Sequence, residues 1–499
     1  NLQNEIEDFR WRLYDYPVNQ MHGAHSAVPT LLINRHQIDK LSDAKAYLTR
    51  LNNVPEFFNQ LIVGIDQRTE AGIVPPKFVF PHVIRDSQNI IKGAPFDDGP
   101  DNALFADFKG KLDVLAEKDD ALSDKQITQL LASVEDALRH SVKPAYEKLI
   151  AHMTELEKTA TTDDGVWKWP AGEEFFKIAL QRTTTTDLTA DQIHETGLSE
   201  VKRIHAEMRK IKEQVSFDGD LQAFMQFMRE DKQFIYAAND DGRARYLREA
   251  TALIDTMKSR LDELFITKPK ADLQVKVVES FREKSTAKAF YQQPSEDGSR
   301  PGLYYANLYD MASMPSYQME ALAYHEGIPG HHMQIAISQE LQDVPKFRKY
   351  GHYTAYVEGW GLYSEMVPKE IGLYQDPYSD FGRLAMELWR ACRLVVDTGI
   401  HTKKWTREQG IDYYINNTPN TKWDAIKMVE RHIVMPSQAT AYKIGMLKIL
   451  ELREAARTKL GNDFDIREFH DVVLKYGPLP LGVLQQKVEK WTVSVETVP

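Results

Sequence analysis

Cysteine is nearly absent from this sequence of 499 residues, and its scarcity limits what the protein can be. The single cysteine, Cys392, excludes an internal disulfide framework and any metal cluster that needs several thiolates. It stands in the apolar segment 388–392, where we expect a buried structural thiol.

Two other features are missing. No stretch reaches the roughly 18 uncharged apolar residues that a membrane span requires, so we expect no transmembrane segment within the chain. Basic residues are scattered, and 62 Lys and Arg against 73 Asp and Glu give a net charge of −11. This balance disfavours a nucleic-acid partner. With 42% hydrophobic and 27% charged residues, the composition is that of an ordinary soluble globular protein.

Helical periodicity dominates both halves of the chain. Thr189 and Gln192 have the spacing of a capping box, which predicts the start of a helix over 189–212. A different pattern follows residue 302, where the short aromatic segment 303–308 favours a strand. Ser316 is then placed to cap a helix that runs to 326. We expect an extended substrate to pair with an open edge of that strand, near Tyr305 and Asn307.

The helix that follows the strand ends in the segment HEGIPGHH, residues 325–332. In the regular zinc-peptidase motif two histidines stand four positions apart, and the glutamate after the first is the general base. Here the fourth position is Pro329, and the next histidines, His331 and His332, are six and seven positions after His325.

An ideal helix cannot bring these histidines to one ion. Six residues turn about 240° away from the first side chain, and seven residues rise about 10.5 Å. Pro329 has no N–H and its ring pushes against the preceding turn, so the helix must open there. We therefore expect a distortion that returns His331 to a metal shared with His325, and His332 is the alternative ligand or a supporting residue. For this motif alone, the alternative is that these histidines are ordinary surface or core residues beside a helix break.

A third ligand is predicted in the segment 356–365, which places Glu358 and Glu365 seven residues apart on one helical face. Buried carboxylates need partners, and a metal is one. We assign Glu358 as the third ligand and Glu365 as an acceptor that orients a histidine; an exposed carboxylate is about as probable for Glu365. Glu326 is then placed to act as general base on water.

Peptide hydrolysis also needs a donor for the oxyanion. His401 and Tyr442 are the candidates, and for each a packing role is as probable as a catalytic one. A substrate carboxylate could be held by Arg393, Arg431 or Lys443, whereas Glu365 could hold a substrate amine.

Four segments together resemble a known bacterial family. HEGIPGHH at 325–332, YVEGWGLYSE at 356–365, RLVVDTGIH at 393–401 and PSQATAYKIG at 436–445 are similar to the domain-of-unknown-function 885 family, many members of which are described as lipoproteins. The segment 180–198 and the stretch YGPLPL at 476–481 extend the resemblance over nearly the whole chain. The family often has Gly where this chain has Ser437.

The resemblance implies a mainly α fold: an elongated, helical, glutamate-zincin-like peptidase with a deep cleft and a small edge β-sheet beside the zinc helix. We expect a single unit over 1–499, with a helical shell half at 1–290 and a zinc-site half at 291–499. The resemblance, with the missing initial methionine, also favours a lipid anchor on the precursor and a cell-envelope location, periplasmic or membrane-anchored.

The sequence thus predicts a zinc-dependent metallopeptidase that binds one Zn²⁺ and cleaves short or unfolded peptides with Glu326 as general base. Two alternatives stay open. One is an envelope lipoprotein that keeps the zinc site but binds peptides without cleaving them. The other is a zinc amidase that cleaves a non-peptide amide.

Overall fold

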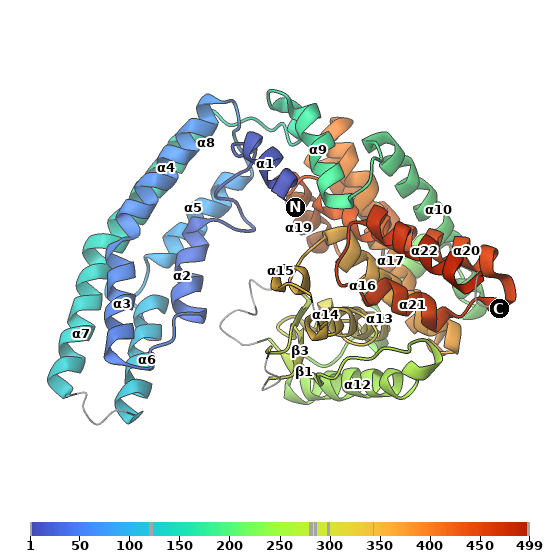
Figure 1. Cartoon of the computed structure of the whole chain (residues 1–499). Helices are drawn as coiled ribbons and strands as arrows, with labels where there is room; N and C mark the ends of the chain where they lie inside the picture. Colours follow the sequence, from blue (N-terminus) through green and yellow to red (C-terminus); the bar gives the residue numbers. More distant parts are fainter. Residues whose placement is uncertain are drawn as a thin grey trace. The chain divides into compact units, whose positions relative to one another are not determined.

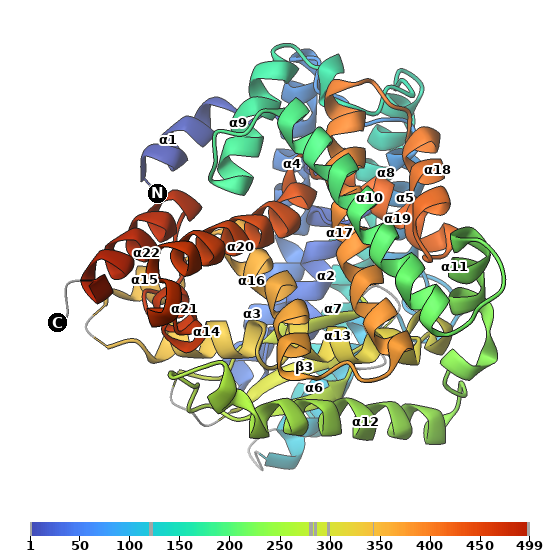
Figure 2. The same ribbon diagram turned by 90° about the vertical axis from the view of Figure 1, so that its right-hand side faces the viewer.

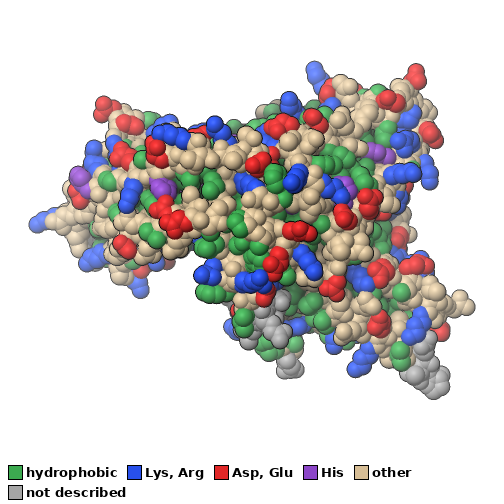
Figure 3. Space-filling model, turned by 90° about the horizontal axis from the view of Figure 1, so that it is seen from above, with side chains coloured by type: hydrophobic (Ala, Val, Ile, Leu, Met, Phe, Trp, Pro, Cys, Tyr) green, Lys and Arg blue, Asp and Glu red, His purple; other side chains and the backbone are tan. Residues whose placement is uncertain are grey.

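The computed structural model describes residues 2–118, 123–278, 283, 287–296, 300–342 and 344–496. Helices dominate these ranges, and three short strands form one small sheet. The expectation of a mainly α protein with a small sheet is confirmed. No described helix is long and apolar enough to cross a membrane. On the face that Figure 3 presents, acidic and basic side chains are interspersed over the surface.

Packing divides the chain into two units, residues 1–175 and 176–499. The sequence interpretation set its halves at 290 and 291, whereas the contacts group 176–290 with the segment that carries the HEGIPGHH motif. The prediction that the whole chain forms one folding unit stays a prediction.

The described residues of the first unit form helices joined by turns and loops (Figure 1). Its helices are α1 Leu2–Arg10, α2 Ala24–Asn34, α3 Leu41–Asn52, α4 Val54–Glu70, α5 Val79–Ile90, α6 Ala103–Lys118, α7 Asp124–Ala137, α8 Lys143–Glu157 and the start of α9 Gly172–Thr184. Fully buried aromatic rings, among them Tyr47, Phe58 and Tyr146, fill the space between the helices.

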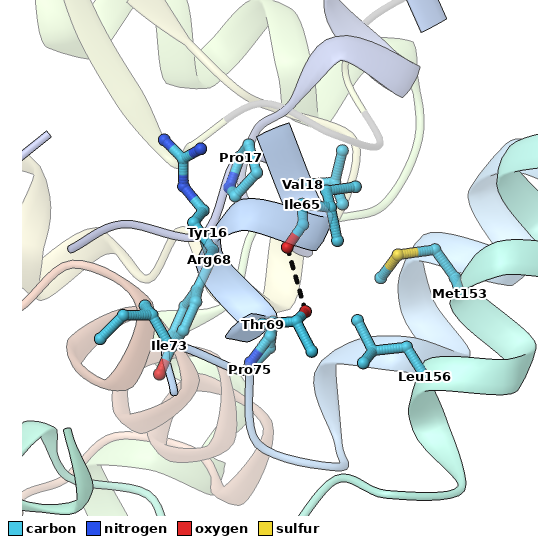
Figure 4. Close-up of a pocket in the computed structure, with 10 residues that line it drawn as sticks. All are labelled: Tyr16, Pro17, Val18, Ile65, Arg68, Thr69, Ile73, Pro75, Met153 and Leu156. Atoms are coloured by element: carbon cyan, nitrogen blue, oxygen red, sulfur yellow. Dashed lines mark hydrogen bonds between the residues drawn. The ribbon is translucent and has the colours of Figure 1, made fainter. Parts of the chain in front are cut away.

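A small cavity in the first unit is lined by side chains from α4, α8 and the segments beside them (Figure 4). Its volume is about 10 Å³, which is room for one water molecule. Thr69 satisfies its hydroxyl by donating to the carbonyl oxygen of Ile65, so little polarity faces the cavity. A cavity of this size and lining offers no room for a substrate.

The second unit contains the remaining helices and the sheet. Its elements are α10 Ala190–Gln214, α11 Leu221–Glu230, α12 Asp240–Ser259, β1 Leu273–Val277, β2 Ala289–Gln292, β3 Gly302–Ala306, α13 Ser316–Glu326, α14 His331–Glu340, α15 Lys346–Lys349, α16 Thr354–Met366, α17 Pro377–Thr402, α18 Arg407–Asn417, α19 Lys422–Val434, α20 Ala441–Leu460, α21 Ile466–Leu474 and α22 Leu481–Glu496. The capping box predicted at Thr189 is present at the start of α10.

The sheet has the strand order β1-β3-β2, with β1 parallel and β2 antiparallel to β3. Figures 1 and 2 show the sheet between α12 on one side and α13 and α14 on the other. The predicted strand at 303–308 is therefore present as β3, beside the helix that carries His325. The expectation that this strand offers an open edge was wrong, because β1 and β2 pair with both of its sides.

Helix α17 forms the centre of the second unit and is buried over almost its whole length. The thiol of Cys392 lies within this helix with no exposed surface, and burial raises its pKa. The prediction of a structural thiol agrees with this position. Helices α10, α13 and α20 all pack against α17, which therefore holds the helices of the HEGIPGHH region together.

Helix α16 packs closely on α20 because both carry a glycine at the contact. A Cβ atom at Gly359 would lie 2.5 Å from the backbone of Gly445, which leaves no room for a side chain. The contact lies next to Glu358 in α16 and about one turn after the start of α20 at Ala441. Ser437, which precedes α20, has a φ of 71°, the left-handed conformation that glycine adopts without strain.

Candidate metal centre

A short turn around Pro329 separates two helices. Helix α13 ends at Glu326, and α14 begins at His331. The turn needs glycine at 330, because a Cβ atom there would lie 2.0 Å from the carbonyl oxygen of His325. The sequence predicts a distortion of the helix at Pro329, and the structure has two separate helices on either side of it. The tight turn brings the side chain of His331 back to that of His325.

Three side chains meet at this turn. Nε2 of His325 lies 3.7 Å from Oε2 of Glu358, and Nε2 of His331 lies 3.5 Å from the same oxygen. One nitrogen or oxygen atom from each residue lies within 4.8 Å of the other two. These are the three residues that the sequence proposed as metal ligands, and they come from α13, α14 and α16.

The donor set and its spacing fit a zinc ion. Zinc takes imidazole nitrogen and carboxylate oxygen at about 2.0–2.2 Å, so tetrahedral ligands stand about 3.4 Å apart. The two nitrogen–oxygen distances, 3.5 and 3.7 Å, are slightly longer than that value, and the side chain of Glu358 is 20% exposed. Part of the Glu358 side chain is thus accessible to solvent.

Gly361 leaves space for the two imidazoles. A Cβ atom at this position of α16 would lie 2.8 Å from Cε1 of His325 and 3.1 Å from Cε1 of His331. Any side chain at 361 would push into the rings that face Glu358. The helix that supplies the third ligand is therefore also shaped to receive the first two.

Glu365 fixes the orientation of His325. Nδ1 of His325 lies 2.7 Å from Oε1 of Glu365, whose side chain is 1% exposed. Because the carboxylate accepts the Nδ1 proton, Nε2 is directed at Glu358 and His331, as a metal-bound histidine requires. Burial opposes a charge on His325, but hydrogen bonds to Glu358 and Glu365 outweigh it and raise the pKa of His325 to about 10.

The pKa of Glu358 moves in the opposite direction. Burial opposes its charged form, yet hydrogen bonds from His325 and His331 hold the pKa of Glu358 well below its usual range. The carboxylate therefore stays ionised and ready to bind a cation. A metal ion at this point would replace the proton on Nε2 of His325.

Glu326 lies at the end of α13, next to His325, and is 8% exposed. Burial raises the pKa of Glu326, while the neighbouring histidines and Arg390 lower it. None of the described residues donates a hydrogen bond to its carboxylate. A carboxylate with a raised pKa and free oxygens is suited to accept and return a proton.

His332 points away from this group. Its Nδ1 accepts from the hydroxyl of Tyr291 at 3.0 Å, and its Nε2 donates to the carbonyl oxygen of Ala271 at 3.0 Å. Burial lowers the pKa of His332 to about 4, so the ring is neutral. Both nitrogens are occupied, and the geometry brings His331, not His332, to Glu358.

The two oxyanion candidates are placed differently. His401 is 1% exposed, its Nε2 donates to the carbonyl oxygen of His432 at 3.0 Å, and its ring packs on Phe176. Burial lowers the pKa of His401 to about 4. Tyr442 is 8% exposed, and the guanidinium of Arg393 lies 4.5 Å from its ring centroid.

The predicted substrate-binding residues also differ in their surroundings. Nζ of Lys443 is fully buried between the carboxylates of Glu387, at 2.6 Å, and Glu200, at 2.8 Å. The side-chain amide of Asn307 donates to the carbonyl oxygen of Glu283 at 2.7 Å. Tyr305 stacks on Phe290 of the neighbouring strand. The contacts of Lys443 and Asn307 are those of structural residues.

Sequence reasoning missed two neighbours of the centre. Nη2 of Arg390 lies 3.5 Å from Oε1 of Glu365. Arg390 and Arg393 stand three apart in an apolar helix, and this spacing was the available signal. His352 lies in the loop before α16, where partial desolvation and the charge of His331 lower its pKa and the charge of Glu358 raises it. Nothing in the local sequence distinguished this histidine from a surface residue.

The sequence matches the family described as "Bacterial protein of unknown function (DUF885)" over residues 1–488. The chain belongs to this family. The resemblance seen in the four motifs is thereby confirmed. The description of DUF885 states no function, so membership identifies the family and not an activity.

Solved structures agree with the DUF885 assignment. A protein from Colwellia psychrerythraea described as a "putative lipoprotein" is 34% identical, with a TM-score of 0.89, and the match covers 96% of this chain and 81% of that one. A "putative lipoprotein of unknown function" from Shewanella oneidensis is 20% identical, with a TM-score of 0.72, over 97% and 86% of the two chains. It shares the fold.

A "putative oligoendopeptidase F" from Bacillus anthracis aligns over 95% of this chain and 82% of its own at 12% identity. Its TM-score of 0.33 is too low to indicate a common fold. Among curated proteins, no sequence matches this DUF885 chain.

Proposed function

We propose that this protein is a zinc-dependent metallopeptidase with His325, His331 and Glu358 as ligands and Glu326 as general base. The observation that carries the proposal is the convergence of two histidines and one carboxylate from three helices, with their ligand atoms within 4.8 Å of one another. The hydrogen bond from His325 to Glu365 supports it, because ligand histidines are commonly oriented by a carboxylate.

A zinc ion bound there would lower the pKa of water and polarise the carbonyl group of a substrate. The chain's own residues complete the reaction. Glu326 accepts a proton from the attacking water, whose oxygen bonds to the carbonyl carbon. The C–N bond then breaks, and Glu326 passes the proton to the leaving amine. Tyr442 is our candidate donor to the oxyanion, since its hydroxyl bonds to none of the described residues. His401 is assigned no step.

The proposal includes the finer features of the expected fold, a glutamate-zincin-like arrangement with a cleft that admits short or unfolded peptides. The partial exposure of Glu358 supports access from solvent. We also propose a cell-envelope location with a lipid anchor on the precursor. The support is the description of the Colwellia relative as a lipoprotein, together with its identity of 34%.

The test is hydrolysis of a mixed peptide library, followed by mass spectrometry, with and without a chelator. The variant is Glu326→Gln. The matched control is Glu320→Gln on the same helix, a buried carboxylate that accepts from Ser379 and Tyr374 and is not part of the metal centre.

We expect cleavage by the wild type and by Glu320→Gln, a loss of at least about 100-fold in Glu326→Gln, and no cleavage after chelation. Cleavage that persists both in the presence of the chelator and in Glu326→Gln would contradict the proposed zinc mechanism. Zinc binding without cleavage of any peptide favours the binding lipoprotein, and cleavage confined to cell-wall fragments favours the amidase.

A further inference from the structure

Two buried arginines lie beside the proposed metal centre, one turn apart on α17. Arg390 is 9% exposed and Arg393 is 6% exposed. Both guanidinium groups face the ring of Tyr442 on α20, at 6.0 Å for Arg390 and 4.5 Å for Arg393. The two arginines and the tyrosine therefore border one small region between α17 and α20.

Several N–H groups of these arginines have no partner among the described residues, although Nη1 of Arg390 donates to the carbonyl oxygen of Met386 at 3.1 Å. Nε and Nη1 of Arg393 and Nε of Arg390 are buried and have no hydrogen-bond partner among the described residues. The described residues also offer no carboxylate within 4.0 Å of Arg393. Buried guanidinium N–H groups without an acceptor are costly, because they lose their hydrogen bonds to water and gain none in return.

Other buried arginines of the same unit show the usual arrangement. Arg383, earlier on α17, lies 2.8 Å from Asp380, and both terminal nitrogens of Arg453 donate to Glu370. Arg393 differs from Arg383 and Arg453 because it has no carboxylate partner among the described residues. The lack of such a partner is not a general property of arginines in this core.

The surroundings of Arg393 are positively charged. Burial lowers the pKa of Arg393, and the charges of Arg390 and Arg431 lower it further. Glu365 lies near Arg390, but its Oε1 already accepts from His325. Arg431 donates to the neutral amide of Gln438. Glu365 is thus near Arg390, whereas no carboxylate of the described residues lies within 4.0 Å of Arg393.

The arginine pair is also close to the proposed chemistry. Arg390 is joined through Glu365 to His325, over distances of 3.5 and 2.7 Å. Its charge also acts on Glu326. Arg390 therefore connects the arginine pair to the proposed metal centre through Glu365.

We propose that Arg390 and Arg393 bind the carboxylate of a peptide substrate, and that this carboxylate is the free C-terminus. The enzyme would then be an exopeptidase that removes residues from the C-terminal end. This inference rests on the proposed function. The planar guanidinium is suited to the geometry of a carboxylate, and Tyr442 beneath it keeps it in place.

The experiment uses three peptides that differ only at the end. One has a free C-terminal acid, the second has the C-terminal amide, and the third is an amide with Glu in place of the last residue. Hydrolysis is measured with the zinc-loaded protein as kcat/KM. Binding of the same peptides to the zinc-free protein is measured by calorimetry, so that one readout does not depend on catalysis.

The variants are Arg393→Gln and Arg393→Lys, with Arg383→Gln as the matched control. Arg383 is a buried arginine on the same helix, paired with Asp380. Loss of folding in a variant would lower turnover of all three peptides together, whereas loss of carboxylate binding lowers only the acid. The ratio of acid to amide is therefore the quantity compared.

We expect the wild type to prefer the acid over the amide by at least about tenfold in both readouts. The preference disappears in Arg393→Gln, is partly kept in Arg393→Lys, and is unchanged in Arg383→Gln. A preference for the Glu-containing amide instead would overturn the assignment to the C-terminus. Equal hydrolysis of acid and amide would overturn the inference but leave the peptidase, whereas a binding preference without hydrolysis would keep the inference and reject the peptidase.

Discussion

At the scale of single residues, the position of His325 between two carboxylates decides what the centre can bind. Glu365 takes the Nδ1 proton, and Glu358 faces Nε2. The ring is therefore fixed in orientation before a metal arrives. His331 has no such support, since its Nδ1 is buried without a partner among the described residues. The contribution of Glu365 should thus be large and separable from that of the ligands.

We predict that Glu365→Gln keeps the fold but weakens zinc binding about 10-fold to 100-fold, because a neutral amide orients His325 less firmly. The measurement is competition with a chromogenic chelator. Glu320→Gln serves as the control and should bind zinc like the wild type. If Glu365→Gln binds zinc equally well, Glu365 does not orient the ligand.

The ligand residues were largely predictable from the sequence, because each left a local signal. Pro329 forbade a regular helix, and the spacing of Glu358 and Glu365 required one helical face. The choice between His331 and His332 was not predictable, since it depends on Tyr291 and Ala271, which lie far away in the sequence. Arg390 was missed for the same reason. Its neighbours Glu365 and Tyr442 come from α16 and α20, and the local sequence around Arg390 does not show that these segments are close in space.

At the scale of elements, α16 contributes to the metal centre through two glycines, which have no side chain. Gly359 lets α20 approach, and Gly361 leaves room for the imidazoles of His325 and His331. Glycine is a poor helix former, so two glycines in one turn weaken the helix by about 1 kcal/mol each relative to alanine. We infer that close packing and the metal centre, not helix stability, account for them.

We predict that Gly361→Ala abolishes zinc binding, because its methyl group would stand 2.8 Å from Cε1 of His325. The matched control is Gly110→Ala in α6, where a Cβ atom meets nothing within 4 Å. That control should bind zinc normally and raise the free energy of unfolding by about 0.5–1 kcal/mol. Zinc content and thermal unfolding are measured for both. Normal zinc content in Gly361→Ala would contradict the described centre.

The sheet shows where element-level reasoning failed. The strand at 303–308 was recognised from its aromatic residues, but its place in the sheet was not. Position in a sheet depends on which segments pair with a strand, and β1 and β2 carry no pattern that identifies β3 as the central strand. Pairing partners are non-local, whereas helix caps such as that at Thr189 are local and were predictable.

At the scale of the whole molecule, several histidines are buried in the neutral form. Burial lowers the pKa of His401 to about 4 and that of His470 to about 3. His470 accepts from the hydroxyl of Tyr363 and donates to the carbonyl oxygen of Leu264, both at 2.8 Å. In the unfolded chain these histidines titrate near pH 6.5.

We therefore expect the folded protein to become less stable as the pH falls. Below about pH 6.5 the unfolded chain binds protons that the folded chain excludes, and this continues down to the folded pKa values near 4 and 3. Each histidine contributes at most about 1.4 kcal/mol per pH unit. We predict a steady loss in the free energy of unfolding between pH 7 and 5, measured in denaturant on the zinc-free protein. Constant stability over this range would contradict neutral burial.

The most direct test of the account is the zinc content of the purified wild type, His331→Ala and His332→Ala after dialysis against the same buffered zinc. The account predicts one zinc per chain in the wild type and in His332→Ala, and none in His331→Ala. Loss of zinc from His332→Ala alone, or no zinc in the wild type, would contradict the metal centre formed by His325, His331 and Glu358.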